Sequence, residues 1–103
     1  MNVGSIKENS PERRISVTPD TTKNLKDLGL NVLLEKGYGE SLGFKDKDYE
    51  SKGAQILSNA KEVLSNSNLI CKVNFPNEKE VDSIKENSSL IISNYRYQKI
   101  YKY

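Results

Sequence analysis

Short apolar runs alternate with longer polar segments along this chain, at the spacing typical of strands joined by helices. Strands connected in this way predict βαβ units and a mainly parallel sheet. The expected fold is therefore a three-layer α/β domain of the flavodoxin or Rossmann-like kind, with helices on both faces of the sheet. The five predicted strands are residues 1–6, 31–35, 54–57, 68–73 and 88–93.

Capping residues mark where the intervening helices begin and end. Thr18 followed by Pro19 and Asp20 is a strong helix start, because the threonine can cap and the proline suits the first helical position. This helix should carry Leu25 and Leu28 on one apolar face and stop at Gly29. Three further helices are predicted: 46–52 ending at Gly53, one capped by Ser58 or Asn59 and running through Val63 and Leu64, and 77–84 with Val81 and Ile84 inward.

The last ten residues, NYRYQKIYKY (94–103), do not fit a complete domain of this kind. A strand at 88–93 should lead into a further helix and more sheet, and this tail can only begin such a helix. We therefore expect residues 1–103 to form the front part of a longer domain, through truncation or gene splitting rather than a compact natural end.

Composition narrows the range of functions. The formal net charge of +2 comes from 16 basic and 14 acidic residues that are interspersed, so nucleic acid is not an expected partner. The single cysteine, Cys71, cannot form an internal disulfide, which favours a reducing compartment and a cytoplasmic location. The sequence contains no histidine, so a histidine-based triad or a histidine-ligated metal site cannot come from this chain. The apolar runs are too short for direct membrane insertion.

Candidate binding residues gather where ligands bind in open α/β sheets, beyond the carboxyl ends of the strands. Lys72 and Asn74 lie at the carboxyl end of the strand at 68–73. Arg14 lies in the charged loop after the first strand, with Lys7, Glu8, Glu12 and Arg13. A guanidinium and an ammonium facing one crevice would suit a small carboxylate or phosphate. The alternative is that these are ordinary solvated charges, which is the usual state of such side chains.

The remaining candidates favour structural roles. The GYGE segment (37–40) lacks the spacing of a phosphate-binding loop, so we interpret it as a turn. Cys71 lies within an apolar run and is expected to be an inert core residue. Glu78 and Glu80 fall in a polar helix and have no partner in the sequence pattern.

Three stretches resemble the N-terminal lobe shared by alanine dehydrogenase and the alpha subunit of proton-translocating NAD(P) transhydrogenase. They are KENSPERRISVTP (7–19), LKDLGLNVLLEKGYGESLGFKDKDYESKGAQI (25–56) and LICKVNFP (69–76). By this resemblance, Arg14 and Lys72 match the residues that hold pyruvate or alanine in alanine dehydrogenase. The run from Lys72 to Pro76 is similar to the transhydrogenase form Lys-Val-Asn-x-Pro, whereas alanine dehydrogenases have Lys-Val-Lys-Glu-Pro and a later catalytic histidine. Arg96 or a neighbour stands near that histidine's place. Ile6 replaces the family's usual proline, and the match after Ser93 is poor.

The resemblance therefore implies the N-terminal part of a transhydrogenase alpha subunit. The intact enzyme transfers hydride from NADH to NADP⁺ and couples this to proton translocation. NAD(H) and NADP(H) bind elsewhere in that enzyme, because the NAD-binding Rossmann lobe lies beyond this chain, and this chain alone is expected to bind neither cofactor. The implied partners are the remaining polypeptides, including a membrane domain and an NADP-binding beta subunit, in a dimeric enzyme at the cytoplasmic face of the inner membrane. The alternatives are a fragment of an alanine dehydrogenase and a non-enzymatic split-gene or decayed product.

Overall fold

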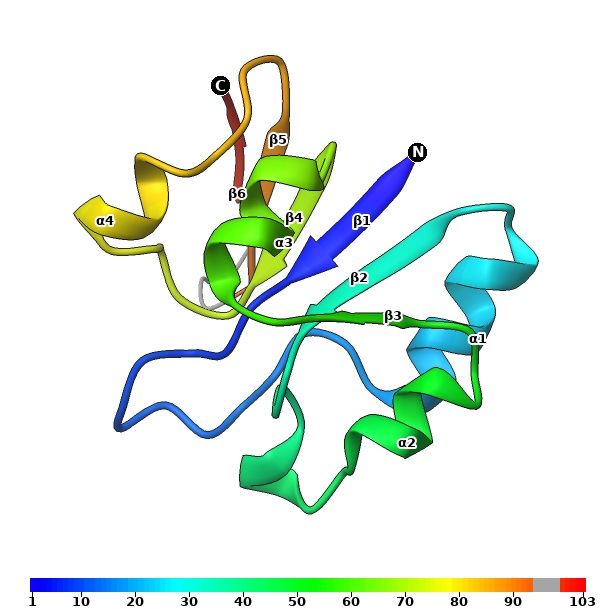
Figure 1. The fold of residues 1–103 in the computed structure, drawn as a ribbon. Helices are drawn as coiled ribbons and strands as arrows, with labels where there is room; N and C mark the ends of the chain where they lie inside the picture. The colour runs from blue at the N-terminus through cyan, green and yellow to red at the C-terminus, as the bar shows by residue number, and fades with distance from the viewer. Residues whose placement is uncertain (94–98) are drawn as a thin grey trace.

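A six-stranded sheet organises the molecule, with the strands in the order β3-β2-β1-β4-β5-β6 (Figure 1). The computed structural model describes residues 1–93 and 99–103. The first five strands pair in parallel, and β6 runs antiparallel to β5. The mainly parallel α/β fold expected from the sequence is therefore confirmed. The strands are β1 (Asn2–Ser5), β2 (Asn31–Glu35), β3 (Gln55–Leu57), β4 (Leu69–Lys72), β5 (Ser89–Ile92) and β6 (Lys99–Lys102).

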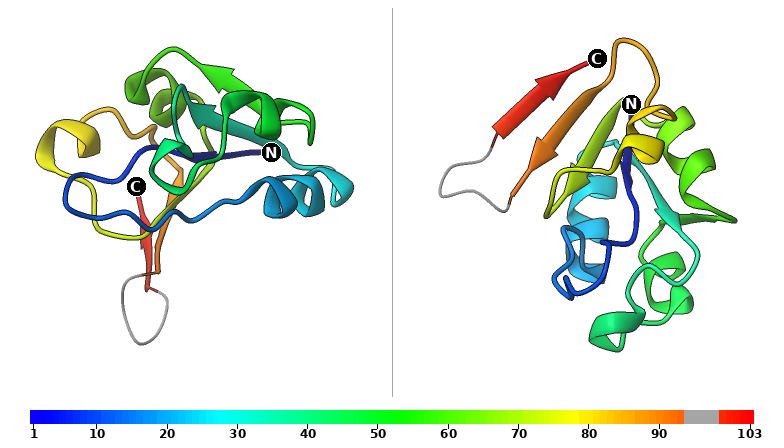
Figure 2. Two further views of the ribbon diagram at one scale, coloured as in Figure 1. Left: turned by 90° about the horizontal axis from the view of Figure 1, so that it is seen from below. Right: turned by 90° about the vertical axis from the view of Figure 1, so that its left-hand side faces the viewer.

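Helices pack against both faces of this sheet (Figure 2). On one face α1 packs on β2 and α2 on β3, while α3 covers β1, β2 and β3 from the opposite face and α4 packs beside α3. The helices are α1 (Pro19–Asp27), α2 (Asp46–Glu50), α3 (Ala60–Asn66) and α4 (Glu78–Val81), with a short 3₁₀ helix, η1, at Glu40–Leu42.

Each face carries its own apolar core, because successive strand residues point to opposite sides. In β2, Leu33 belongs to the α3 side, whereas Val32 and Leu34 belong to the α1 and α2 side. The α3-side core consists of Ile6, Leu33, Val63, Leu64, Ile70, Leu90 and Ile92. The α1-side core consists of Val17, Val32, Leu34, Tyr38, Tyr49 and Ala54.

The sequence signals for α1 are confirmed at both ends. The Thr18 side chain accepts a hydrogen bond from the Thr21 backbone N–H at 3.2 Å. At the other end Gly29 has a φ of +85°, and the Leu30 N–H donates to the Leu25 carbonyl at 3.1 Å, which closes the helix. The predicted apolar face is only half right, because Leu25 packs on the core but Leu28 is 76% exposed.

A close approach of α3 to β1 depends on Gly4. A Cβ atom built on Gly4 would lie 1.9 Å from Ser67 Oγ and 2.9 Å from Val63 Cγ1. The side chain of Ser67 is itself fixed by donating to the Val63 carbonyl at 2.6 Å. The absence of a side chain at position 4 thus lets α3 pack directly on the sheet backbone.

The end of the chain differs from the expectation. Residues 99–102 form β6 and pair antiparallel with β5, where the sequence suggested the start of a helix. Ile100 and Tyr101 are residue types that favour strands, and the pairing with β5 overrides the helical interpretation. Residues 94–98, and with them Arg96, lie outside the described residues.

Candidate functional site at the carboxyl ends of β1 and β4

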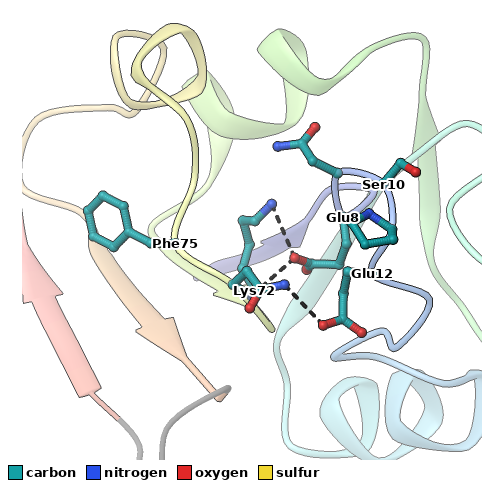
Figure 3. Close-up of a pocket in the computed structure, with 8 residues that line it drawn as sticks. Glu8, Ser10, Glu12, Lys72 and Phe75 are labelled. Carbon is teal, nitrogen blue, oxygen red and sulfur yellow. Dashed lines mark hydrogen bonds and ion pairs between the residues drawn. The ribbon is translucent and has the colours of Figure 1, made fainter.

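Lys72 is buried, although it is the last residue of β4. Its side chain is 1% exposed, and its Nζ lies 3.4 Å from Glu8 Oε1 (Figure 3). The same Nζ lies 3.8 Å from Glu80 Oε1. Strand alternation explains the burial, since Lys72 pairs in register with Ile92 on the α3 side of the sheet. The interpretation of Lys72 as a solvated surface charge is therefore wrong. The expectation that Glu80 has no partner is wrong as well.

Glu8 fastens the loop after β1 to the end of β4. Its carboxylate accepts hydrogen bonds from the backbone N–H groups of Val73 at 2.9 Å and Asn74 at 3.1 Å. Its side chain is 2% exposed, so these bonds and the ion pair with Lys72 compensate the burial of the charge. A loop carboxylate thereby sets where the residues after β4 lie.

A second carboxylate, Glu12, holds Arg14. It accepts hydrogen bonds from Arg14 Nε at 2.9 Å, Arg14 Nη2 at 2.8 Å and the Arg14 backbone N–H at 2.9 Å. Asn74 Nδ2 also donates to Glu12 Oε1 at 3.0 Å. These bonds lower the pKa of Glu12 from its ordinary value of 4.5 to about 2, with the Arg14 side chain the largest cause. Asn74 therefore joins the Glu12–Arg14 pair to the Glu8–Lys72 pair.

Two neighbouring pockets share these carboxylates. A pocket of about 440 Å³ is lined by Lys72, Asn74 and Phe75 together with Glu8 and Glu12. A pocket of about 210 Å³ has Arg14 in its wall, with Glu8 and Glu12 again. The two predicted cations thus lie on either side of the same two carboxylates. Because the larger pocket has two carboxylates and one ammonium, it suits a neutral or cationic group better than an anion.

Two buried tyrosines, which sequence reasoning did not single out, anchor the segment that leads from Arg14 to α1. The Tyr38 hydroxyl accepts from the N–H groups of Ser16 and Val17, each at 3.1 Å, and lies 2.8 Å from Ser5 Oγ. The Tyr49 hydroxyl donates to the Val17 carbonyl at 2.8 Å. Burial raises the pKa of Tyr38 to about 12, so its hydroxyl keeps its proton. The one sequence signal for Tyr38 was its position between Gly37 and Gly39, two glycines of a predicted turn.

Cys71 is half-buried on the opposite side of the sheet from Lys72. Burial raises the pKa of the thiol to about 11, so the nucleophilic thiolate is scarce at neutral pH. The expected inertness agrees with this shift, although Cys71 does not belong to either core.

Within residues 1–93 and 99–103, no three histidine, cysteine, aspartate or glutamate side chains gather in a way that could hold a metal ion. The same residues contain no helix that is both long and apolar enough to cross a membrane.

Comparison with known proteins assigns this arrangement to a family. The model of the family described as "Alanine dehydrogenase/PNT, N-terminal domain" matches residues 4–99 of this chain. The chain belongs to the alanine dehydrogenase/PNT family. The resemblance expected from the three sequence stretches is thereby confirmed.

Relatives that resemble this chain carry at least three different activities in their names. One is the N(5)-(carboxyethyl)ornithine synthase of Lactococcus lactis, which is 35% identical over 88% of this chain and 28% of its own length. Two others are a transhydrogenase subunit and an alanine dehydrogenase. The NAD(P) transhydrogenase subunit alpha of Cereibacter sphaeroides is 30% identical over 78% of this chain and 15% of its own length. An alanine dehydrogenase of Methanococcus maripaludis is 36% identical over 82% of this chain and 22% of its own length. The last two names describe oxidoreductases.

A solved structure supports the same relationship. The transhydrogenase from Sinorhizobium meliloti superposes with a TM-score of 0.79 and 29% identity, over 85% of this chain and 26% of that chain. This chain thus spans about a quarter or less of each of these four relatives.

Proposed function

We propose that this chain is the N-terminal part of a proton-translocating NAD(P) transhydrogenase alpha subunit. In the intact enzyme, hydride passes from NADH to NADP⁺ and proton translocation is coupled to that transfer. The chain would form one wall of the cleft between itself and the NAD-binding Rossmann lobe. The rest of the enzyme would supply that lobe, the membrane domain and the NADP-binding beta subunit. NAD(H) would bind to the Rossmann lobe and NADP(H) to the beta subunit. Hydride transfer needs the two nicotinamides positioned together.

The hydrogen bonds of Asn74 to two carboxylates are the observation that supports this proposal. In the run from Lys72 to Pro76, Asn74 donates to Glu12 while its own N–H is held by Glu8. Lys72 and Arg14 are therefore each engaged by a carboxylate of the chain itself. Because both of these cations are already paired, Lys72 and Arg14 are suited to supporting this wall rather than to holding a small carboxylate substrate. A Lys-Val-Lys-Glu-Pro run would place a third cation and another carboxylate here instead.

Alanine dehydrogenase is the second candidate, and one observation favours it. The Methanococcus maripaludis alanine dehydrogenase is 36% identical to this chain, compared with 30% for the Cereibacter sphaeroides subunit. In that case Arg14 and Lys72 would hold the substrate carboxylate, after Glu12 and Glu8 had moved away from them.

Chimeric enzymes test the choice between these candidates. This chain would replace the matching segment of the Cereibacter sphaeroides subunit alpha, and separately that of the Methanococcus maripaludis alanine dehydrogenase. We expect NADH-dependent reduction of an NADP⁺ analogue when the first chimera is assembled with the remaining subunits of that transhydrogenase, and no pyruvate- and ammonia-dependent oxidation of NADH in the second. Activity of the second chimera alone would reverse the assignment. Two folded but inactive chimeras would favour the non-enzymatic alternative.

A further inference from the structure

One ion pair joins the walls of two cavities. The pocket of about 440 Å³ at the carboxyl ends of β1 and β4 has Lys72 in its wall. A second cavity, of about 260 Å³, lies between α3 and α4, and we call it the α3–α4 groove. Its lining includes Leu64 of α3 and Glu80 of α4. Because Lys72 Nζ lies 3.8 Å from Glu80 Oε1, a change on one side of this contact reaches the other cavity.

Little else holds α4 in place. Its four residues, Glu78–Val81, include none that is buried. Within residues 1–93 and 99–103, the ion pair of Glu80 with Lys72 is the only polar side-chain contact that α4 makes outside its own cap. Packing of Ile84 on the α3-side core fixes the chain only after the helix has ended. The helix is therefore an element of low local stability, and it depends on Glu80.

A single oxygen of Glu80 serves both α4 and Lys72. Glu80 Oε1 accepts a hydrogen bond from the Asn77 N–H at 3.0 Å, and the Asn77 side chain accepts one from the Glu80 N–H at 2.8 Å. These reciprocal bonds cap the first turn of α4. Since Lys72 Nζ faces the same oxygen, the first turn of α4 is tied to the position of the ammonium group.

Neither carboxylate holds the Lys72 ammonium closely. Its distances of 3.4 Å to Glu8 Oε1 and 3.8 Å to Glu80 Oε1 both exceed about 2.7–2.9 Å, the usual length of a charge-assisted hydrogen bond. The Glu8 carboxylate is fixed in addition by the backbone N–H groups of Val73 and Asn74. Glu80, on the less firmly held element, is the partner that Lys72 would lose first.

We propose that the contact between Lys72 and Glu80 is a latch on α4. A group in the pocket that draws the Lys72 ammonium toward itself weakens the contact with Glu80, and α4 then separates from α3 and widens the α3–α4 groove. Occupancy of the pocket thereby changes the surface beside α3. The latch is built from residues of this chain alone and does not depend on which activity the intact enzyme has.

Amide hydrogen exchange of this chain, followed by NMR, tests the latch. The N–H groups of residues 81–84 report on α4, because they donate to carbonyls of Asn77, Glu78, Glu80 and Val81. Glu80→Gln removes the charge that faces Lys72 but keeps an oxygen for the Asn77 N–H. We expect exchange at residues 81–84 to become about threefold to tenfold faster. Lys72→Met should act in the same direction, and the double variant should exchange no faster than the faster single variant.

Glu78→Gln is the matched control. It makes the same change of charge in α4, but Glu78 is exposed and forms no ion pair within the described part of the chain. Its effect on exchange at residues 81–84 should be clearly smaller than that of Glu80→Gln. The amides of Leu90 and Ile92 in β5 monitor global unfolding, and they should remain protected in each variant.

Asn9→Asp tests the pocket end of the latch. Asn9 lines the same pocket as Lys72, and this isosteric change adds a carboxylate there. The new charge should draw the ammonium away from Glu80 and speed exchange at residues 81–84 at least about twofold. The effect should disappear in the Lys72→Met background, and Asn9→Ala should not reproduce it.

Three results would overturn the proposal. The first is exchange at residues 81–84 that is already as fast as in an unfolded chain, since nothing would then hold α4. The others are equal effects of Glu80→Gln and Glu78→Gln, and exchange that Asn9→Asp leaves unchanged. All three are read without an enzymatic assay, so the failure of this inference is distinct from inactive chimeras.

Discussion

The two faces of the sheet are built in different ways from the same strands. The α3 side gathers aliphatic residues from β2, β4 and β5, and it ends in the buried ion pair of Lys72 and Glu8. The α1 side is confined to one half of the sheet, and its two buried tyrosines bond to the segment after Arg14. The first face holds the strands together by packing, whereas the second ties the segment between β1 and α1 to the sheet. Four sets of substitutions probe these contributions.

The largest effect is expected at the end of the α3 side. Glu8→Ala leaves Lys72 buried without its nearest carboxylate and removes the acceptor of two backbone N–H groups, so it should cost about 3–5 kcal/mol of unfolding free energy. Urea denaturation followed by circular dichroism measures this cost. The double variant Glu8→Ala, Lys72→Met should recover a large part of it, because no unpaired charge remains. A cost below about 1 kcal/mol for Glu8→Ala would mean that Lys72 reaches solvent in solution.

Adjacent isoleucines of β5 compare the two faces directly. Ile92→Ala should cost about 2–5 kcal/mol, because Ile92 is fully buried on the α3 side and its loss creates a cavity. Ile91 is half-buried on the opposite side of the sheet, so Ile91→Ala should cost only about 1 kcal/mol or less, since little apolar area is lost from a packed environment. The two midpoints in urea give the comparison. Equal costs would show that Ile91 is packed as fully as Ile92 in the isolated chain.

The tyrosine anchor of the α1 side has an intermediate expected effect. Tyr38→Phe removes the acceptor of the Ser16 and Val17 N–H groups, and leaving these groups unpaired should cost about 1–3 kcal/mol. Faster amide exchange at residues 16 and 17 would accompany the loss. Tyr49→Phe serves as the matched variant, with a smaller expected cost because only the Val17 carbonyl loses a donor. Unchanged exchange at Ser16 and Val17 would refute the anchoring role of Tyr38.

Acid should weaken the molecule through Glu12, with the smallest effect of the four. The folded-state pKa of about 2 lies below the ordinary value of 4.5, so the unfolded chain binds a proton first as the pH falls. The stabilisation by Glu12 is complete above about pH 4.5 and is lost progressively towards pH 2. Thermal unfolding between pH 6 and pH 2 should therefore show a shallower pH dependence for Glu12→Gln than for the unaltered protein. Identical slopes would exclude Glu12 as a contributor.

Local signals in the sequence predicted the local parts of this structure. The five parallel strands and the ends of α1 follow from apolar runs, Thr18 and Gly29, because capping and strand formation depend on neighbouring residues. Leu28 and β6 were predicted incorrectly, since the exposure of one and the pairing of the other depend on distant parts of the chain.

The candidate site was predictable in its residues but not in its pairing. Arg14, Lys72 and Asn74 do lie near one another, as the carboxyl ends of parallel strands require. The contacts of Lys72 with Glu8 and Glu80 join positions far apart in the sequence, and burial of a lysine contradicts its usual exposure. No local pattern indicates which carboxylate meets which cation. The same applies to Tyr38, whose partners lie in two other segments.

Gly4 has a consequence for how this domain can change during evolution. The space that a Cβ at position 4 would need is occupied by the side chains of Ser67 and Val63. A substitution at position 4 is therefore compatible with the present fold only when positions 63 or 67 shrink or α3 moves outward. Alignments of related sequences should consequently show these three positions varying together, with larger side chains on α3 only where position 4 remains glycine.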